Sequence, residues 1–194
     1  MKSGDEKTSV WTLPNRLSLV RIVFIPAIVY LISRQEELAL LVACFLFVIA
    51  GITDGLDGLI ARRMSMKTRF GLYLDPIADK LLVSCVLIAL SCYRSNEFGV
   101  PLWVTLIMVS REFLINGLRS FYAVGGTTLH SSFAGKLKTT LQIVGISCVL
   151  FSGSTYGAPL FQTAGLLLIY AALCFSLYSA YRYVHGVFQA DAKG

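Results

Sequence analysis

Four aspartates stand at spacings that favour metal-dependent chemistry. Asp54 and Asp57 are three positions apart, and Asp75 and Asp79 are four positions apart. In a helix, each spacing places two side chains on one face, about one turn from each other. Four carboxylates without His or Cys form a hard, all-oxygen ligand set that suits Mg²⁺ or Mn²⁺. Such a set can hold two ions, the arrangement that stabilises both the attacking and the leaving oxygen of a phosphoryl transfer.

Small and basic residues extend these two faces. Gly58 follows Asp54 by four positions, and Gly71 precedes Asp75 by four. The glycines either allow close helix packing or leave room for a ligand to approach the backbone. Arg62 either anchors its helix at a membrane surface or reaches a phosphate held by metal ions. A solvated helix cap explains one aspartate alone, but it does not explain four on two matched faces.

The segments that carry these residues are strongly apolar. Apolar residues make up 56% of the 194-residue chain and charged residues only 14%, with a mean hydropathy of +0.70. A soluble domain has about 25% charged residues, and a membrane-spanning helix needs roughly 20 apolar ones. We therefore expect an all-α integral membrane bundle of six transmembrane helices. The apolar segments are 17–33, 38–60, 70–93, 100–122, 134–152 and 160–183.

The charge distribution predicts how this bundle is oriented. Of the 17 Lys and Arg residues, all except Arg34 and Arg94 lie nearer the membrane face of the termini and of the second and fourth loops. Basic residues favour the cytoplasmic side, so the termini and the site should be cytoplasmic. We expect a polar N-terminal segment over 1–16, a catalytic domain over 17–185 and a cytoplasmic tail over 186–194. The basic balance fits anionic headgroups and phosphates and not nucleic acid.

The stretch that holds the aspartates resembles the signature of the CDP-alcohol phosphotransferases. Eight fixed residues of that signature fall within 26 positions: Asp54, Asp57, Gly58, Ala61, Arg62, Gly71, Asp75 and Asp79. The resemblance implies the fold of that family, with six transmembrane helices and usually a homodimer, and a CDP-activated donor. It also implies two divalent cations, Mg²⁺ or Mn²⁺. Asp54 and Asp75 would bridge the ions, with Asp57 on one and Asp79 on the other.

The same resemblance implies roles for individual residues. Asp79 would be the base that accepts the proton of the incoming alcohol. The residues expected to contact the CDP-diacylglycerol donor are Asn15, Arg21, Gly58, Arg62, Thr68 and Gly71. Asn15 and Arg21 belong to an opening stretch, 13–21, that is similar to one in the bacterial members of the family whose acceptor is sn-glycerol 3-phosphate.

Four cations further along the chain favour a phosphorylated acceptor. Arg111 and Arg119 fall in the expected fourth helix, and Lys136 and Lys138 at the start of the fifth. The dianion of sn-glycerol 3-phosphate would bind such a cluster, whereas serine or choline would not need it. The stretches 111–113 and 135–139 also resemble the glycerol 3-phosphate-dependent members. The alternative is that these are ordinary positive-inside charges.

Arg111 is the least ordinary of the four cations. It lies inside an apolar run directly before Glu112. Because a charge at such a position needs a partner, the sequence predicts that Arg111 has a buried partner, and Glu112 is its neighbour.

Together these features predict an enzyme of the bacterial cytoplasmic membrane. We expect it to transfer the phosphatidyl group from CDP-diacylglycerol to sn-glycerol 3-phosphate, giving phosphatidylglycerophosphate and CMP. The same chemistry with another acceptor stays open: inositol phosphate, serine, or phosphatidylglycerol as in a cardiolipin synthase. Two other classes are a divalent-cation transporter and a catalytically silent relative. A transporter leaves Arg62 and the glycines unexplained, and it would need polar residues across the full membrane depth.

Overall fold

The computed structural model describes residues 13–64, 69–93, 98–124, 133–154 and 158–191. Within these ranges, the description of side chains excludes residues 13–18, 54–64, 69–79, 119–124, 133–136 and 187–191. The described residues form six helices: α1 (Leu13–Arg34), α2 (Glu37–Met64), α3 (Arg69–Cys92), α4 (Leu102–Val124), α5 (Phe133–Ser152) and α6 (Pro159–Asp191). The predicted all-α class and the order of six helices are therefore confirmed.

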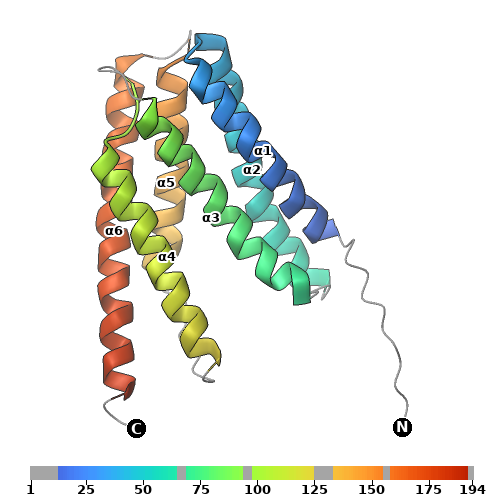
Figure 1. The fold of residues 1–194 in the computed structure, drawn as a ribbon, viewed down its shortest axis with the longest axis vertical. Helices are drawn as coiled ribbons and strands as arrows, with labels where there is room; N and C mark the ends of the chain where they lie inside the picture. The colour runs from blue at the N-terminus through green and yellow to red at the C-terminus, as the bar shows by residue number, and fades with distance from the viewer. Residues whose placement is uncertain (1–12, 65–68, 94–97, 125–132, 155–157, 192–194) are drawn as a thin grey trace.

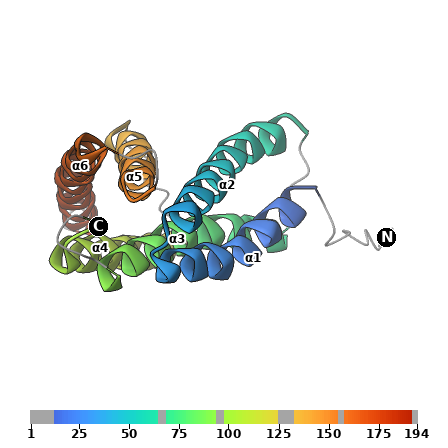
Figure 2. The ribbon, with the colours of Figure 1, turned by 90° about the horizontal axis from the view of Figure 1, so that it is seen from above.

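Successive helices run in opposite directions along the bundle (Figure 1). The start of α1 and the end of α6 lie at the lower end in that view, as do the last turns of α2 and α4 and the first turns of α3 and α5. α1 packs against α2 and α3, and α5 packs along α6 (Figures 1 and 2). This arrangement places the end of α2 and the start of α3 at the same end of the bundle as the start of α1 and the end of α6.

The helices are longer than the apolar segments at both ends of the chain. α1 begins at Leu13, within the predicted N-terminal segment, because Pro14 fits the first turn of a helix, where a backbone N–H is not needed. α6 continues past residue 183 to Asp191, within the predicted tail. The parts 1–12 and 192–194 lie outside the described residues.

At the upper end of the bundle, the side-chain amides of two glutamines donate hydrogen bonds to backbone carbonyls between helices. Gln35, which follows α1, has a left-handed backbone with φ of 52°, a conformation that ends helices. Its Nε2 donates a hydrogen bond to the carbonyl of Tyr93, after α3. Gln162 Nε2, on α6, donates to the carbonyl of Gly99 at 2.8 Å, before Pro101 and α4. The first bond satisfies a carbonyl at the end of α3, and the second satisfies a carbonyl in the loop before α4.

The inner faces of the helices form one apolar core, and the outer faces are also apolar. Fully buried side chains come from all six helices and include Ile28, Ile32, Phe47, Leu87, Leu90, Val104, Ile146, Leu150 and Ile169. Large apolar side chains that are more than half exposed occur on α1, α2, α4 and α6: Val23, Leu38, Phe45, Leu106, Leu114 and Leu167. Apolar surface on so many helices is typical of a bundle that contacts lipid.

Among the described residues, one stretch passes a test of length and composition for crossing a membrane. It is Pro159–Gly186, within α6. Shorter apolar stretches are Glu37–Thr53 in α2, Lys80–Cys92 in α3 and Leu137–Ser152 in α5. Membrane crossing by all six helices stays a prediction.

Two glycines allow the close packing of α5 on α6. A Cβ added at Gly165 would lie 2.8 Å from the carbonyl oxygen of Gly145, and one added at Gly145 would lie 3.0 Å from that of Gly165. Both neighbouring atoms are backbone, so neither can move without shifting a helix. Small residues at such contacts let helix backbones approach each other in membranes.

We expect Gly165→Ala to destabilise the bundle by about 1–3 kcal/mol, the usual cost of overpacking. The gain in helix propensity, up to about 1 kcal/mol, partly offsets this cost. The measurement is the thermal unfolding midpoint of the purified protein in detergent. Gly117→Ala on α4 is the matched control, because an added Cβ there meets nothing within 4 Å. Equal midpoints for the two variants would contradict the close contact.

Candidate active site

The four aspartates lie on two helices, α2 and α3, in the halves nearer the lower end of the bundle (Figure 1). Asp54 and Asp57 are in the second half of α2, and Asp75 and Asp79 are in the first half of α3. The helical backbone keeps each pair about one turn apart on one face, as predicted. A donor set of four carboxylates fits hard divalent cations.

The meeting of the two carboxylate pairs stays a prediction. The side chains of all four aspartates lie outside the described residues. Figure 2 shows the second half of α2 diverging from α1 and α3. Among the described side chains, no group of three or more His, Cys, Asp or Glu is placed to hold a metal ion. That set does not include the four aspartates.

Five of the six residues predicted to contact the donor lie on α1, α2 and α3. Four have a described helical backbone without described side chains: Asn15, Gly58, Arg62 and Gly71. Thr68 lies outside the described residues. Arg21 is buried in α1, with 2% of its surface exposed, and α1 packs against both aspartate-bearing helices. A buried guanidinium on this helix is compatible with binding a phosphate of the donor.

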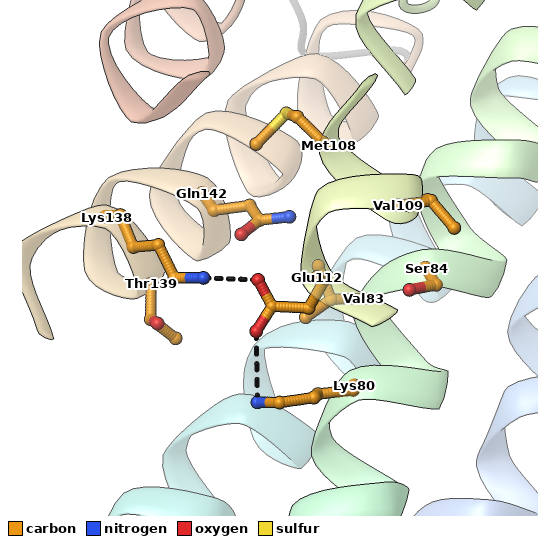
Figure 3. Close-up of a pocket in the computed structure, with 9 residues that line it drawn as sticks. All are labelled: Lys80, Val83, Ser84, Met108, Val109, Glu112, Lys138, Thr139 and Gln142. Carbon is orange, nitrogen blue, oxygen red and sulfur yellow. Dashed lines mark hydrogen bonds and ion pairs between the residues drawn. The ribbon is translucent and has the colours of Figure 1, made fainter. Parts of the chain in front are cut away.

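The best-defined polar site is an ion-pair cluster of Lys80, Arg111, Glu112 and Lys138, here called the Glu112 cluster. Glu112 Oε1 lies 3.2 Å from Nζ of Lys80 on α3. Glu112 Oε2 accepts a hydrogen bond from Nη1 of Arg111 at 2.8 Å and another from Nζ of Lys138 on α5. Figure 3 shows the carboxylate of Glu112 between the two lysines. One side chain of α4 thus joins three helices.

Burial explains why these charges gather. The side chains of Arg111 and Lys138 are each 9% exposed. A cation removed from water to this extent is costly unless an anion and hydrogen bonds compensate it. Glu112 supplies that anion to both. Nε of Arg111 is buried and has no hydrogen-bond partner, so this guanidinium keeps a donor for a further acceptor.

A small cavity of about 20 Å³ adjoins the cluster, enough room for a water molecule. It is lined by residues of α3, α4 and α5: Lys80, Val83, Ser84, Met108, Val109, Glu112, Lys138, Thr139 and Gln142. Figure 3 shows these side chains around Glu112. The lining combines cations with hydroxyl and amide groups, which is a suitable environment for an anion and its bound water.

Arg111 has a partner, as predicted: it pairs with Glu112, whose side chain is 21% exposed, and Lys138 lies in the same cluster. Arg119 is in α4 and Lys136 in α5, but their side chains lie outside the described residues, so their roles stay predictions.

Lys80 is a site residue that was not predicted from the sequence. Lys80 follows Asp79 directly, so the two side chains project from α3 in directions about 100° apart. The side chain of Lys80 points toward Glu112 on α4. The same reasoning that predicted a partner for Arg111 applies to this lysine, because it too lies in an apolar helix. Its ion pair with Glu112 brings the cation cluster within one residue of the predicted base.

The chain belongs to the CDP-alcohol phosphatidyltransferase family, whose model matches residues 11–178. Several bacterial relatives carry the name CDP-diacylglycerol–glycerol-3-phosphate 3-phosphatidyltransferase. The one from Rickettsia typhi is 38% identical over 171 residues, which cover 88% of this chain and 94% of the relative. The one from Bacillus subtilis is 35% identical over 187 residues, covering 90% and 94%. The one from Salmonella choleraesuis is 34% identical over 179 residues, covering 90% and 93%. The family predicted from the eight-residue signature is thus confirmed.

Proposed function

We infer that the chain transfers the phosphatidyl group of CDP-diacylglycerol to sn-glycerol 3-phosphate, giving phosphatidylglycerophosphate and CMP. Membership of the family supports the donor chemistry. The names of relatives that match nearly their whole length support this acceptor. The single structural observation that carries the acceptor assignment is the Glu112 cluster, because it concentrates buried cations beside the helix that bears Asp79.

In the proposed reaction, the aspartates act as the base and as metal ligands. Asp79 takes the proton of the 1-hydroxyl of glycerol 3-phosphate. The freed oxygen attacks the phosphorus that bears the diacylglycerol, and the bond from that phosphorus to CMP breaks. Two divalent cations held by Asp54, Asp57, Asp75 and Asp79 would neutralise the charge on the phosphates.

The cations bind the phosphate at the other end of the acceptor. Arg111 offers its unpaired Nε–H, and the ammonium group of Lys138 has further donors besides the one bound to Glu112. Arg119 and Lys136 are proposed to add to this site. Holding the acceptor by its phosphate brings its hydroxyl toward Asp79, an advantage of proximity that lowers the barrier of a two-substrate reaction.

The donor binds at the lower end of α1, α2 and α3. Gly58 and Gly71 leave room for the CDP group, while Arg21 and Arg62 bind its phosphates. Asn15 and Thr68 complete this proposed site.

We propose that the enzyme is embedded in the bacterial cytoplasmic membrane with its termini and site on the cytoplasmic side. The exposed apolar side chains on four helices support lipid contact. The common end of the helical termini and the two aspartate-bearing segments, together with the strong bias of basic residues, supports this orientation. The homodimer rests on resemblance to the family.

An acceptor screen tests the proposed function. Purified protein is given CDP-diacylglycerol, Mg²⁺ and one alcohol, and CMP release is measured. We expect release with sn-glycerol 3-phosphate at a rate at least about 100-fold above that with serine or phosphatidylglycerol, because neither of these acceptors carries the phosphate monoester dianion that the buried cations are proposed to bind. Faster release with inositol phosphate or serine would overturn the acceptor assignment and leave the donor chemistry intact.

A further inference from the structure

Glu112 has an unusual place for a carboxylate in a site that binds an anion. Three cations from α3, α4 and α5 share its two oxygens, and two of those cations are nine-tenths buried. An additional anion in such a site repels the phosphate of the acceptor and competes for its donors. Its presence therefore needs a reason beyond the binding of that phosphate.

Charge balance supplies one reason. Three cations and one carboxylate leave the Glu112 cluster with two net positive charges. A phosphate monoester carries a charge of about −1.5 to −2 at neutral pH. The Glu112 cluster, counted without Arg119 and Lys136, therefore matches the acceptor phosphate in charge. Without Glu112, three cations, two of them nine-tenths buried, would face each other with no compensating charge before the acceptor arrives.

Geometry supplies the second reason. Lysine ammonium groups lie on flexible stems, and holding them in one arrangement costs conformational entropy. Glu112 fixes Lys80 through one oxygen and both Arg111 and Lys138 through the other. This leaves the remaining donors of Arg111 and Lys138 in place for a ligand. Because Lys80 follows Asp79, the same contact also fixes the rotation of α3 beside the predicted base.

We propose that Glu112 is a positioning residue for the acceptor: it orders Lys80, Arg111 and Lys138 and sets the charge of the site that binds the phosphate of glycerol 3-phosphate. It acts through these cations and does not touch the acceptor. This role rests on the proposed function.

The test is the effect of Glu112→Gln on the two Michaelis constants. We expect KM for glycerol 3-phosphate to rise at least about tenfold, the effect of losing one charged hydrogen-bond network. KM for CDP-diacylglycerol should change less than about threefold, because the donor binds elsewhere. Glu112→Asp keeps the charge but shortens the reach, and we expect an intermediate rise with the same selectivity. Equal changes in both constants would show a merely structural role and overturn the proposal.

Glu36→Gln is the matched control. Glu36 also pairs with an arginine, Arg34, at 2.6 Å, but this pair is exposed at the other end of the bundle. We expect neither Michaelis constant to change. If Glu112→Gln cannot be recovered as folded protein, the two Michaelis constants of Glu112→Asp are compared with those of the wild type instead.

A double-mutant cycle separates action through Lys138 from independent effects. In a Lys138→Gln background, Glu112→Gln should raise KM for glycerol 3-phosphate less than about threefold, because its main partner is already gone. An undiminished effect would contradict the proposal.

Wild-type protein that is inactive with glycerol 3-phosphate would overturn the proposed function and this role together. An active wild type with an unselective Glu112→Gln variant would overturn this role alone.

Discussion

Replacing Asp79 by asparagine should reduce CMP release by about 10³-fold or more. An amide has the size of the carboxylate but cannot accept the proton of the acceptor hydroxyl, and general bases contribute about 10²–10⁴-fold to rate. The substitution also removes one of four charges from the proposed metal site. The measurement is the initial rate at saturating CDP-diacylglycerol and glycerol 3-phosphate, with the KM for each substrate.

Asp191→Asn is the control for this substitution, because it makes the same chemical change at the end of α6, far along the chain from the signature. It should leave the rate within about twofold of wild type, because Asp191 belongs neither to the signature nor to the Glu112 cluster and substitutions away from such features usually change little. Asp79→Asn should also elute and unfold as the wild type does, since the helix that carries Asp79 needs no carboxylate. A variant at Asp79 that retains more than a tenth of the wild-type rate would contradict the assignment of this residue as the base.

Removal of divalent cations should abolish activity, to below about 1% of the starting rate. In the proposed site the four carboxylates would repel one another, so a neutralising cation would be needed both for their stability and for charge stabilisation in the reaction. Incubation with a chelator, followed by exchange into chelator-free buffer, should give inactive protein. Added Mg²⁺ or Mn²⁺ should restore the rate.

The thermal unfolding midpoint offers a second readout of the same claim. An ion that binds only the folded state stabilises it by mass action, so chelation should lower the midpoint and Mg²⁺ should raise it again. The Asp54→Asn and Asp75→Asn double variant should lose this response. Full activity after chelation, or an unchanged response in the double variant, would contradict a metal site formed by these carboxylates.

The helices could be predicted closely because their signals are local. For example, the long apolar run and the helix-breaking residue Pro101 place the predicted start of α4 within two positions of its observed start at Leu102. The end of α6 could not be predicted in this way. Residues 184–191 mix polar and apolar side chains, so the apolar pattern ends while the backbone hydrogen bonds continue. Hydropathy reports the environment of a helix, and its end depends on where the backbone stops being paired.

Residues of the candidate site could be identified from the sequence only where the signal lies in residues close together in the chain. The aspartate signature depends on spacing within two neighbouring helices, and the Arg111–Glu112 pair joins consecutive residues. Lys80 and Lys138 reach Glu112 from other helices. The rotation of each helix about its axis decides such contacts, and this rotation is set by the packing of the whole bundle. A single sequence contains no direct signal for the rotation of its helices.

The transfer of labelled acceptor into lipid tests the central claim most directly. Purified protein is incubated with CDP-diacylglycerol, Mg²⁺ and radiolabelled sn-glycerol 3-phosphate, and the organic phase and CMP are both quantified. We predict that label enters a single lipid, phosphatidylglycerophosphate, in equal amount to the CMP released. CMP release without label in the lipid would contradict the account, because the chain would then hydrolyse its donor instead of transferring the phosphatidyl group to glycerol 3-phosphate.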